Sequence, residues 1–245
     1  MRLRAHCAGE AESLKEIIRK RKSVRKYEQA PLDGAVLEKI TAQLANLKPL
    51  DPSIKYEIEI VTKTKGMFNI KAPHYLVFRS EEKEGACENI GFIGQQMDLF
   101  LSENELGTCW LGVSKPDEKK SASGLSCLIC MSFGLPDEPV YRSYQQFKRK
   151  ELGAISQGSD PRLEAARLAP SGMNAQNWYF IADQGSIHCY RKKVNPLLGF
   201  WLNDLARIDL GIAICHIAEE SEDFKFAVQA DAPKKNGYVY FGTAR

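Results

Sequence analysis

The 245-residue sequence has no apolar run close to the roughly 20 residues that a membrane-spanning helix needs. Its N-terminus is positively charged but lacks the apolar segment of a secretory signal. It also lacks a strong charge of either sign, because 34 Lys and Arg stand against 31 Asp and Glu, a net charge of +3. A charge this small does not by itself indicate a nucleic-acid partner. We therefore expect a cytoplasmic globular protein of one large domain or two small ones.

Regular patterns of cysteine and histidine are also missing. The seven cysteines are irregularly spaced and the four histidines are scattered, which indicates free thiols and no metal site. Cys127 and Cys130 form a C-x-x-C, a pattern found in redox pairs and zinc half-sites. They lie in an apolar segment that reads as a buried strand, where residues i and i+3 point to opposite faces. We therefore expect two separate core cysteines.

Hydrophobic periodicity predicts helices at residues 11–21, 33–47, 88–104, 160–168 and 202–219. Gly107 is expected to end the third of these helices as a C-terminal cap. Apolar and alternating segments predict strands at residues 55–62, 74–79, 110–113, 125–133, 178–182, 187–190, 225–228 and 238–241. Strands mixed with long helices predict an α/β or α+β sandwich.

The two halves of the sequence resemble each other. Segments that align in order are Lys20–Val24 with Lys148–Leu152, Leu37–Glu38 with Leu163–Glu164, Pro49 with Pro170, Asn89–Gly91 with Asp209–Gly211, and Phe133–Gly134 with Phe241–Gly242. The spacing between partners only shrinks along the chain, as deletions in a second copy would produce. We therefore predict a duplicated unit, with copies at residues 1–147 and 148–245 that pack as one pseudo-dimer.

Each copy holds only part of the unusual polar residues. In extended backbone, Arg21, Ser23 and Arg25 would point to one side, and two guanidiniums with a hydroxyl suit a phosphate monoester. A solvated basic surface is the alternative for residues 19–26. A weaker alternative is that residues 19–26 and 148–150 bind nucleic acid.

The polar segment Ala169–Trp178 stands out in the second copy, and the first copy lacks its polar residues. Ser171, Asn174 and Gln176 could together read the edge of a planar heterocycle. The alternative is a capped turn in which these side chains bond to nearby backbone. We expect one of these side chains, rather than all three, to bond to nearby backbone in this way.

Together these motifs resemble those of the FMN-dependent nitroreductase family. The matches are R-x-S-x-R at Arg21, Ser23 and Arg25, A-P-S-x-x-N-x-Q-x-W at Ala169–Trp178, G-T-x-W-L-G at Gly107–Gly112, and R-K-x-L at Arg149–Leu152. Asn177 replaces the usual proline, and the A-P-S element lies unusually far from R-x-S-x-R. The resemblance spans residues 16–245. It implies an α+β, nitroreductase-like α/β sandwich of two pseudo-two-fold related copies, each a mixed sheet flanked by helices, with one FMN where the copies meet.

The resemblance also implies a role for each motif. Arg21, Ser23 and Arg25, with Lys22 and Arg149, would hold the phosphate and ribityl chain of FMN. The residues that would line the flavin ring are Pro170, Ser171, Met173, Asn174 and Gln176. The backbone at Leu111 and Gly112 would lie near flavin N5. FMN itself carries hydride chemistry, so no catalytic side chain and no metal is expected.

The implied activity is hydride transfer from NADH or NADPH through FMN to a nitroaromatic, a quinone or a similar electron-poor small molecule, in a ping-pong cycle. No G-x-G-x-x-G follows a predicted strand, so a separate Rossmann nicotinamide domain is not expected. The resemblance implies that the nicotinamide binds transiently in the substrate pocket. A flavin-binding or flavin-storing protein without turnover is the alternative. We expect a monomer with no nucleic-acid and no membrane partner.

Overall fold

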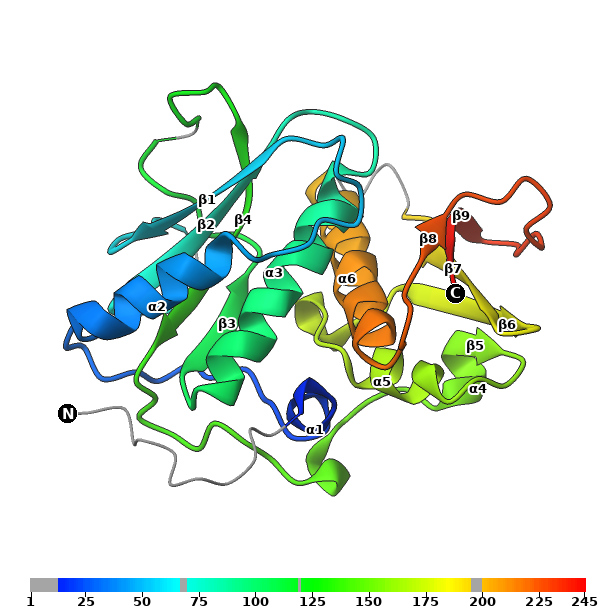
Figure 1. The fold of residues 1–245 in the computed structure, drawn as a ribbon, viewed down its shortest axis with the longest axis horizontal. Helices are drawn as coiled ribbons and strands as arrows, with labels where there is room; N and C mark the ends of the chain where they lie inside the picture. Colours follow the sequence, from blue (N-terminus) through cyan, green and yellow to red (C-terminus); the bar gives the residue numbers. More distant parts are fainter. Residues whose placement is uncertain (1–12, 67–69, 119, 195–199) are drawn as a thin grey trace. The chain divides into compact units, whose positions relative to one another are not determined.

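The computed structural model describes residues 13–66, 70–118, 120–194 and 200–245, which form two compact units (Figure 1). Unit 1 takes the described residues up to Lys48, together with Lys55–Glu81 and Gln96–Ser143. Unit 2 takes Pro49–Ile54, Glu82–Gln95 and Tyr144–Arg245. The start of the predicted helix at residues 11–21 lies outside the described residues.

Unit 1 contains a four-stranded antiparallel sheet in the order β1-β2-β4-β3. Its strands are β1 (Tyr56–Val61), β2 (His74–Ser80), β3 (Gly107–Leu111) and β4 (Ser126–Gly134). Its helices are α1 (Leu14–Ile18), α2 (Gly34–Leu44) and the second half of α3 (Ala86–Glu103). Every residue of β2 is buried, which matches the apolar run at its centre and its position between two neighbouring strands. The Asp33 carboxylate caps α2 by accepting the Ala35 N–H at 2.9 Å.

Strand β4 is irregular at Leu128. Cys127 pairs with Arg79 while Ile129 pairs with Phe78, so Leu128 is the extra residue of a β-bulge. Cys127 and Cys130 consequently lie on one face, with their sulfurs 3.9 Å apart. The expectation that they point to opposite faces is wrong, because the two-residue period holds only in a strand without an insertion.

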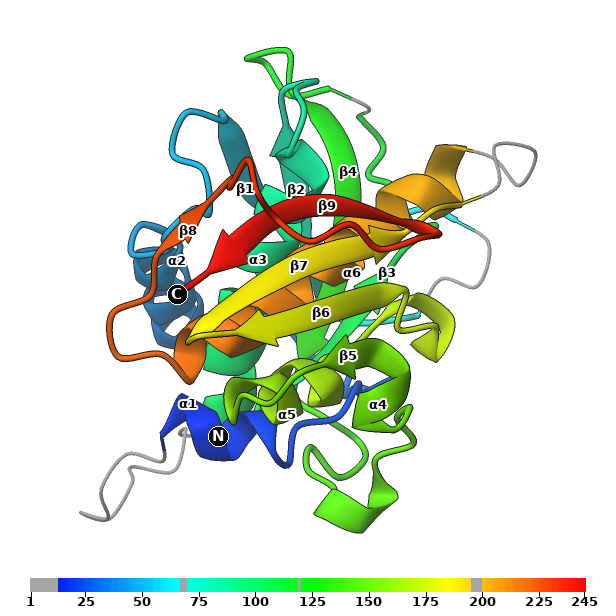
Figure 2. The same ribbon diagram turned by 90° about the vertical axis from the view of Figure 1, so that its right-hand side faces the viewer.

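Unit 2 contains a five-stranded sheet in the order β5-β6-β7-β9-β8, which can be followed from bottom to top in Figure 2. Its strands are β5 (Ser156–Gln157), β6 (Trp178–Asp183), β7 (Ser186–Lys192), β8 (Phe226–Ala227) and β9 (Tyr238–Ala244). Only the short β5 pairs in parallel. Helix α6 (Phe200–Glu219) covers the sheet at β6, β7 and β9, and α5 (Arg162–Leu168) packs on α6. Short helical turns are α4 (Leu152–Ile155), η1 (Tyr144–Gln146) and η2 (Gly172–Asn174).

Two glycines allow the first half of α3 to pack closely on α6 inside unit 2. A Cβ on Gly91 would lie 2.1 Å from the Ile208 carbonyl oxygen, and one on Gly211 would lie 1.9 Å from that of Glu88. The contact is reciprocal, because each glycine meets the residue three positions before the other glycine. Gly91 meets Ile208, and Gly211 meets Glu88. This packing places Glu82–Gln95 in unit 2, whereas the sequence repeat assigned them to the first copy.

The two sheets have the same order of elements. The antiparallel run β1-β2-β4-β3 corresponds to β6-β7-β9-β8, with α2 and α5 before the first strand and α3 and α6 after the second. This correspondence and the reciprocal glycine contact support a duplication, which stays a prediction. The predicted α+β class is confirmed. Of the helices in the described parts of the chain, none has the length and apolar character needed to cross a membrane.

Candidate functional site

The R-x-S-x-R segment of unit 1 is extended and is held by isolated pairing to neighbouring backbone. Arg21 pairs with Tyr141 and Ser23 with Thr108, and the Val24 N–H donates to the Thr108 carbonyl oxygen at 2.8 Å. Val24 is fully buried, whereas Ser23 is half-buried and Arg25 is exposed. The segment is therefore anchored in the core through Val24, while Ser23 and Arg25 reach the surface.

Arg21 is completely buried and carries an unused donor. Its Nε atom lies 3.0 Å from Oδ2 of Asp98, whose side chain is also fully buried and accepts a short hydrogen bond from the Thr108 hydroxyl. Its Nη2 atom lies 3.5 Å from the Ser23 Oγ. Among the described residues, its buried Nη1 atom has no hydrogen-bond partner. Leaving such a donor unpaired costs free energy, and an anionic oxygen would be the strongest acceptor for it.

Arg142 adds a third guanidinium that the sequence did not indicate. Its Nε atom donates to the Arg21 carbonyl oxygen at 3.0 Å. Burial, together with the positive charges of Arg21 and Arg25, lowers the pKa of Arg142 to about 10. Positive charges that repel one another in a partly buried region favour the binding of an anion, which offsets the repulsion.

Glu138 fixes the backbone of this segment. Its carboxylate accepts the N–H groups of Arg25 and Lys26 at 2.6 and 3.2 Å and pairs with the Lys22 ammonium at 3.1 Å. Lys22 is therefore already neutralised within unit 1. Leu111, buried at the end of β3, pairs with Cys130, and Gly112 follows it half-buried.

In unit 2 the side chains of Ser171, Asn174 and Gln176 all make local hydrogen bonds. Ser171 Oγ accepts the Gln176 N–H at 3.0 Å, and Gln176 Oε1 accepts the Lys150 N–H at 2.8 Å. Asn174 donates to the Lys148 carbonyl oxygen at 2.7 Å and accepts from Arg149 Nη1 at 2.6 Å. We expected one of these three side chains to make local hydrogen bonds, and all three make them. Asn174 and Gln176 do so because residues 148–150 lie within hydrogen-bonding distance.

The same loop has an unusual backbone. Met173, Asn174 and Gln176 have φ angles of 52°, 56° and 47°, in the left-handed region that residues other than glycine rarely adopt. Met173 is 79% exposed although it is apolar, while Pro170 is buried. Strained backbone of this kind persists where the surrounding structure enforces it, and it is common at binding sites.

Asp209 holds the loop from α6. Its two carboxylate oxygens accept the Gly172 N–H at 2.9 and 3.1 Å. Burial raises the pKa of Asp209 to about 7, although the hydrogen bond from Gly172 opposes the shift. Asp209 aligns with Asn89 in the sequence repeat. Asn89 has a similar role, because its Oδ1 atom accepts the N–H groups of Leu50 and Asp51 at 2.8 and 3.0 Å.

The raised pKa of Asp209 predicts a pH-dependent stability. The folded protein binds this proton more tightly than the unfolded chain, so the free energy of unfolding falls as the pH rises between 3.8 and about 7. We expect Asp209→Asn, which keeps an acceptor for Gly172, to gain about 3 kcal/mol of stability over the wild type between pH 5 and pH 8. Urea unfolding of both proteins at the two pH values measures this, and a stability difference that is the same at both pH values would refute it.

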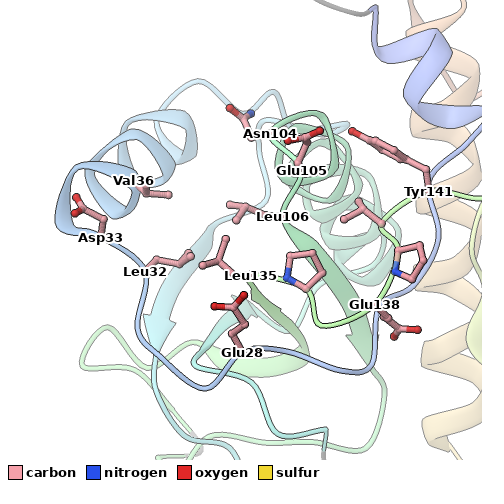
Figure 3. Close-up of a pocket in the computed structure, with 13 residues that line it drawn as sticks. Glu28, Leu32, Asp33, Val36, Asn104, Glu105, Leu106, Leu135, Glu138 and Tyr141 are labelled. Carbon is pink, nitrogen blue, oxygen red and sulfur yellow. The ribbon is translucent and has the colours of Figure 1, made fainter. Parts of the chain in front are cut away.

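Unit 1 also has a cavity of about 540 Å³ (Figure 3). Leu32, Leu106 and Leu135 line it, and its other lining residues include the carboxylates of Glu28, Asp33, Glu105 and Glu138. Among the described residues, none that lines it is positively charged, so it does not suit a phosphate group. In the described ranges, no group of three or more His, Cys, Asp or Glu side chains could hold a metal ion.

The fold and the basic segment define a nitroreductase-type α+β protein. The family described as "Putative TM nitroreductase" matches residues 13–221, well over half of the chain. The chain belongs to this nitroreductase family.

A solved structure that the chain covers almost completely has the same fold. The "putative nitroreductase" of Thermotoga maritima is 19% identical, with a TM-score of 0.69 over 98% of this chain and 96% of that chain. An FMN-dependent nitroreductase from Clostridium difficile is 18% identical, with a TM-score of 0.41 over 55% of this chain and 98% of that chain. Nitroreductase A from Vibrio parahaemolyticus is 17% identical, with a TM-score of 0.43 over 63% and 80%. No curated protein matches the chain.

Proposed function

We propose that this protein is an FMN-dependent oxidoreductase that passes hydride from NADH or NADPH to a small electron-poor acceptor, such as a nitroaromatic or a quinone. Membership of the nitroreductase family supports an oxidoreductase. The observation that carries the FMN assignment is the buried Arg21, whose Nη1 donor has no acceptor and which lies near two further guanidiniums. An FMN phosphate would satisfy this donor and offset the local positive charge.

In this proposal unit 1 binds the phosphate end of FMN. Asp98 orients the Arg21 guanidinium, and Glu138 fixes the backbone so that Ser23 and Arg25 stay near it. Arg142 adds charge and anchors the backbone of Arg21. Lys22 contributes less than its sequence position suggested, because Glu138 pairs with it. The backbone at Leu111 and Gly112 is proposed to donate a hydrogen bond to the flavin.

Unit 2 is proposed to contact the flavin ring through backbone and Met173 rather than through amide side chains. Asn174 and Gln176 use their polar atoms within the loop, and Arg149 is held by Asn174 and by the Leu168 carbonyl oxygen at 3.1 Å. Pro170, Ser171, Asn174, Gln176 and Arg149 therefore set the shape of the loop, and the exposed Met173 is its apolar contact. When bound, FMN supplies the hydride chemistry, and the chain supplies position and electrostatics.

We also propose that the chain binds a single FMN, because each copy of the repeat keeps only some of the motif residues. Glu151 and Gly153 stand in the second copy where the first has Ser23 and Arg25. A carboxylate at that position would repel a phosphate.

A matched pair of variants tests the phosphate assignment. Arg25 is exposed, so Arg25→Ala should leave stability unchanged while it weakens FMN binding about 10- to 100-fold, the value of one or two charge-assisted hydrogen bonds. Glu151→Ala, at the position of the second copy that aligns with Ser23, should bind FMN as the wild type does. Titration of the apoprotein by flavin fluorescence measures both. Equal losses in the two variants would contradict a single phosphate site in unit 1.

Activity is tested separately from binding. Bound FMN that NADH or NADPH reduces, and that nitroaromatics or quinones reoxidise, supports the proposed reaction. Bound FMN that neither nicotinamide reduces would indicate a flavin-storing protein instead.

A further inference from the structure

The C-x-x-C of β4 is a pair of facing thiols outside the residues proposed to bind FMN. Cys127 and Cys130 pair across the ladder with Arg79 and Val77, which lie two residues apart on β2. Their Cα atoms are consequently roughly 7 Å apart, about twice the rise per strand residue. A disulfide usually spans Cα separations up to about 6.8 Å, so a small adjustment at the bulge allows one.

The two thiols differ in exposure and environment. Cys127 is partly exposed, whereas Cys130 is fully buried. The Lys115 ammonium donates to the carbonyl oxygens of Cys127 and Leu128 at 3.1 and 2.9 Å, and the buried Arg79 pairs with Glu59 at 3.0 Å beside them. The surroundings of Cys127 are therefore electropositive on balance, with the Glu59 carboxylate as the opposing charge.

These surroundings favour a Cys127 thiolate. The hydrogen bond from Cys130, with the charges of Lys115 and Arg79, lowers the pKa of Cys127 to about 7 against the effect of burial. The pKa of Cys130 is raised by its hydrogen bond to Cys127 and by burial. A partly exposed thiol of low pKa beside a buried thiol of high pKa is the arrangement of a nucleophilic and a resolving cysteine.

The other described cysteines are poor competitors. Cys87, Cys109, Cys189 and Cys215 are all buried. Burial raises the pKa of Cys87 to about 12 and also raises the pKa of Cys109 and Cys189. Within the described part of the chain, Cys127 is the cysteine that is not buried.

We propose that Cys127 and Cys130 form a redox-active dithiol that exchanges reversibly with small-molecule disulfides such as glutathione disulfide. The Cys127 thiolate attacks one sulfur of the disulfide, its S–S bond breaks, and one glutathione thiolate leaves. The Cys130 sulfur then attacks the Cys127 sulfur, forms the internal disulfide and releases the second glutathione. The protein loses two electrons and two protons, and glutathione disulfide gains both as two thiols.

Intact-mass spectrometry tests the proposal on the full chain. All proteins carry Cys7→Ser, because Cys7 lies outside the described residues. After treatment with glutathione disulfide and an acid quench, we expect the parent protein to lose two hydrogens through an internal disulfide that peptide mapping places at Cys127–Cys130. Cys130→Ser should accumulate one glutathione on Cys127, and Cys127→Ser should react at least about tenfold more slowly. Cys215→Ser is the matched control and should behave as the parent.

Three outcomes would overturn the proposal: Cys127→Ser reacting as fast as the parent, Cys130→Ser remaining unmodified, or the parent stopping at the mixed disulfide. Circular dichroism checks that the variants fold. If Cys127→Ser does not fold, timed alkylation of the parent with iodoacetamide replaces it, and modification of any other cysteine before Cys127 contradicts the assignment. The mass readout requires no FMN, so the failure of this proposal and the failure of the proposed flavin function are distinguishable.

Discussion

Replacing Gly211 with alanine is expected to destabilise the protein by about 3–5 kcal/mol. Its Cβ would lie 1.9 Å from the backbone oxygen of Glu88, and backbone cannot move aside as a flexible side chain can. The first half of α3 and α6 would have to separate, and their packed side chains would lose contact. Gly91→Ala should have a similar effect, because its Cβ meets the Ile208 carbonyl oxygen at 2.1 Å.

Gly34→Ala is the matched control for these variants. Nothing lies within 4 Å of a Cβ at Gly34, which begins α2. This change should leave stability unchanged or raise it by about 0.4–1 kcal/mol, because alanine restricts the unfolded chain. Urea unfolding followed by circular dichroism measures all three variants. A Gly211→Ala protein within about 1 kcal/mol of the wild type would show that the helices do not pack as described.

The second large effect is expected from Arg21→Met. The substitution leaves the carboxylate of Asp98 buried without its ion-pair partner, which should cost about 3–5 kcal/mol. It also removes the unpaired buried donor, so FMN binding should be lost. Chemical denaturation and flavin titration at a temperature where the variant is folded measure the two effects.

A double variant separates the two roles of Arg21. Arg21→Met/Asp98→Asn removes both buried charges and keeps an acceptor for the Thr108 hydroxyl. Most of the lost stability should return, because no unpaired charge remains. FMN binding should stay lost. A double variant that binds FMN like the wild type would show that Arg21 is structural only.

Local patterns in the sequence predict most of the long elements. The apolar periodicity of α3 and α6 and the apolar run of β4 are set by neighbouring residues, so each was located to within a few positions. Short elements such as α4 and β5 were not predicted, because a segment of a few residues is too short to show hydrophobic periodicity.

The role of Gly107 could not be predicted from a local sequence pattern. It was expected to cap α3, but Glu105, with φ of 57°, takes the left-handed position after that helix. A Cβ on Gly107 would lie 2.7 Å from Cγ1 of Val24, so the glycine is required by a neighbour from a distant segment.

The candidate site likewise depends on contacts between distant segments. The motif identified Arg21, but its ion-pair partner Asp98, in α3, and its neighbour Arg142 come from other segments. The bulge that brings Cys127 and Cys130 together depends on the register with β2, and no residue type marks it. Contacts between distant segments therefore decide the chemistry of residues that the sequence only locates.

The visible spectrum of the purified protein, mixed with FMN and dialysed, tests the central proposal most directly. The account predicts a yellow protein with one FMN per chain, which NADH or NADPH bleaches and a nitroaromatic or quinone restores. A folded wild-type protein that retains no FMN, and shows no binding when FMN is titrated into it, would contradict the account.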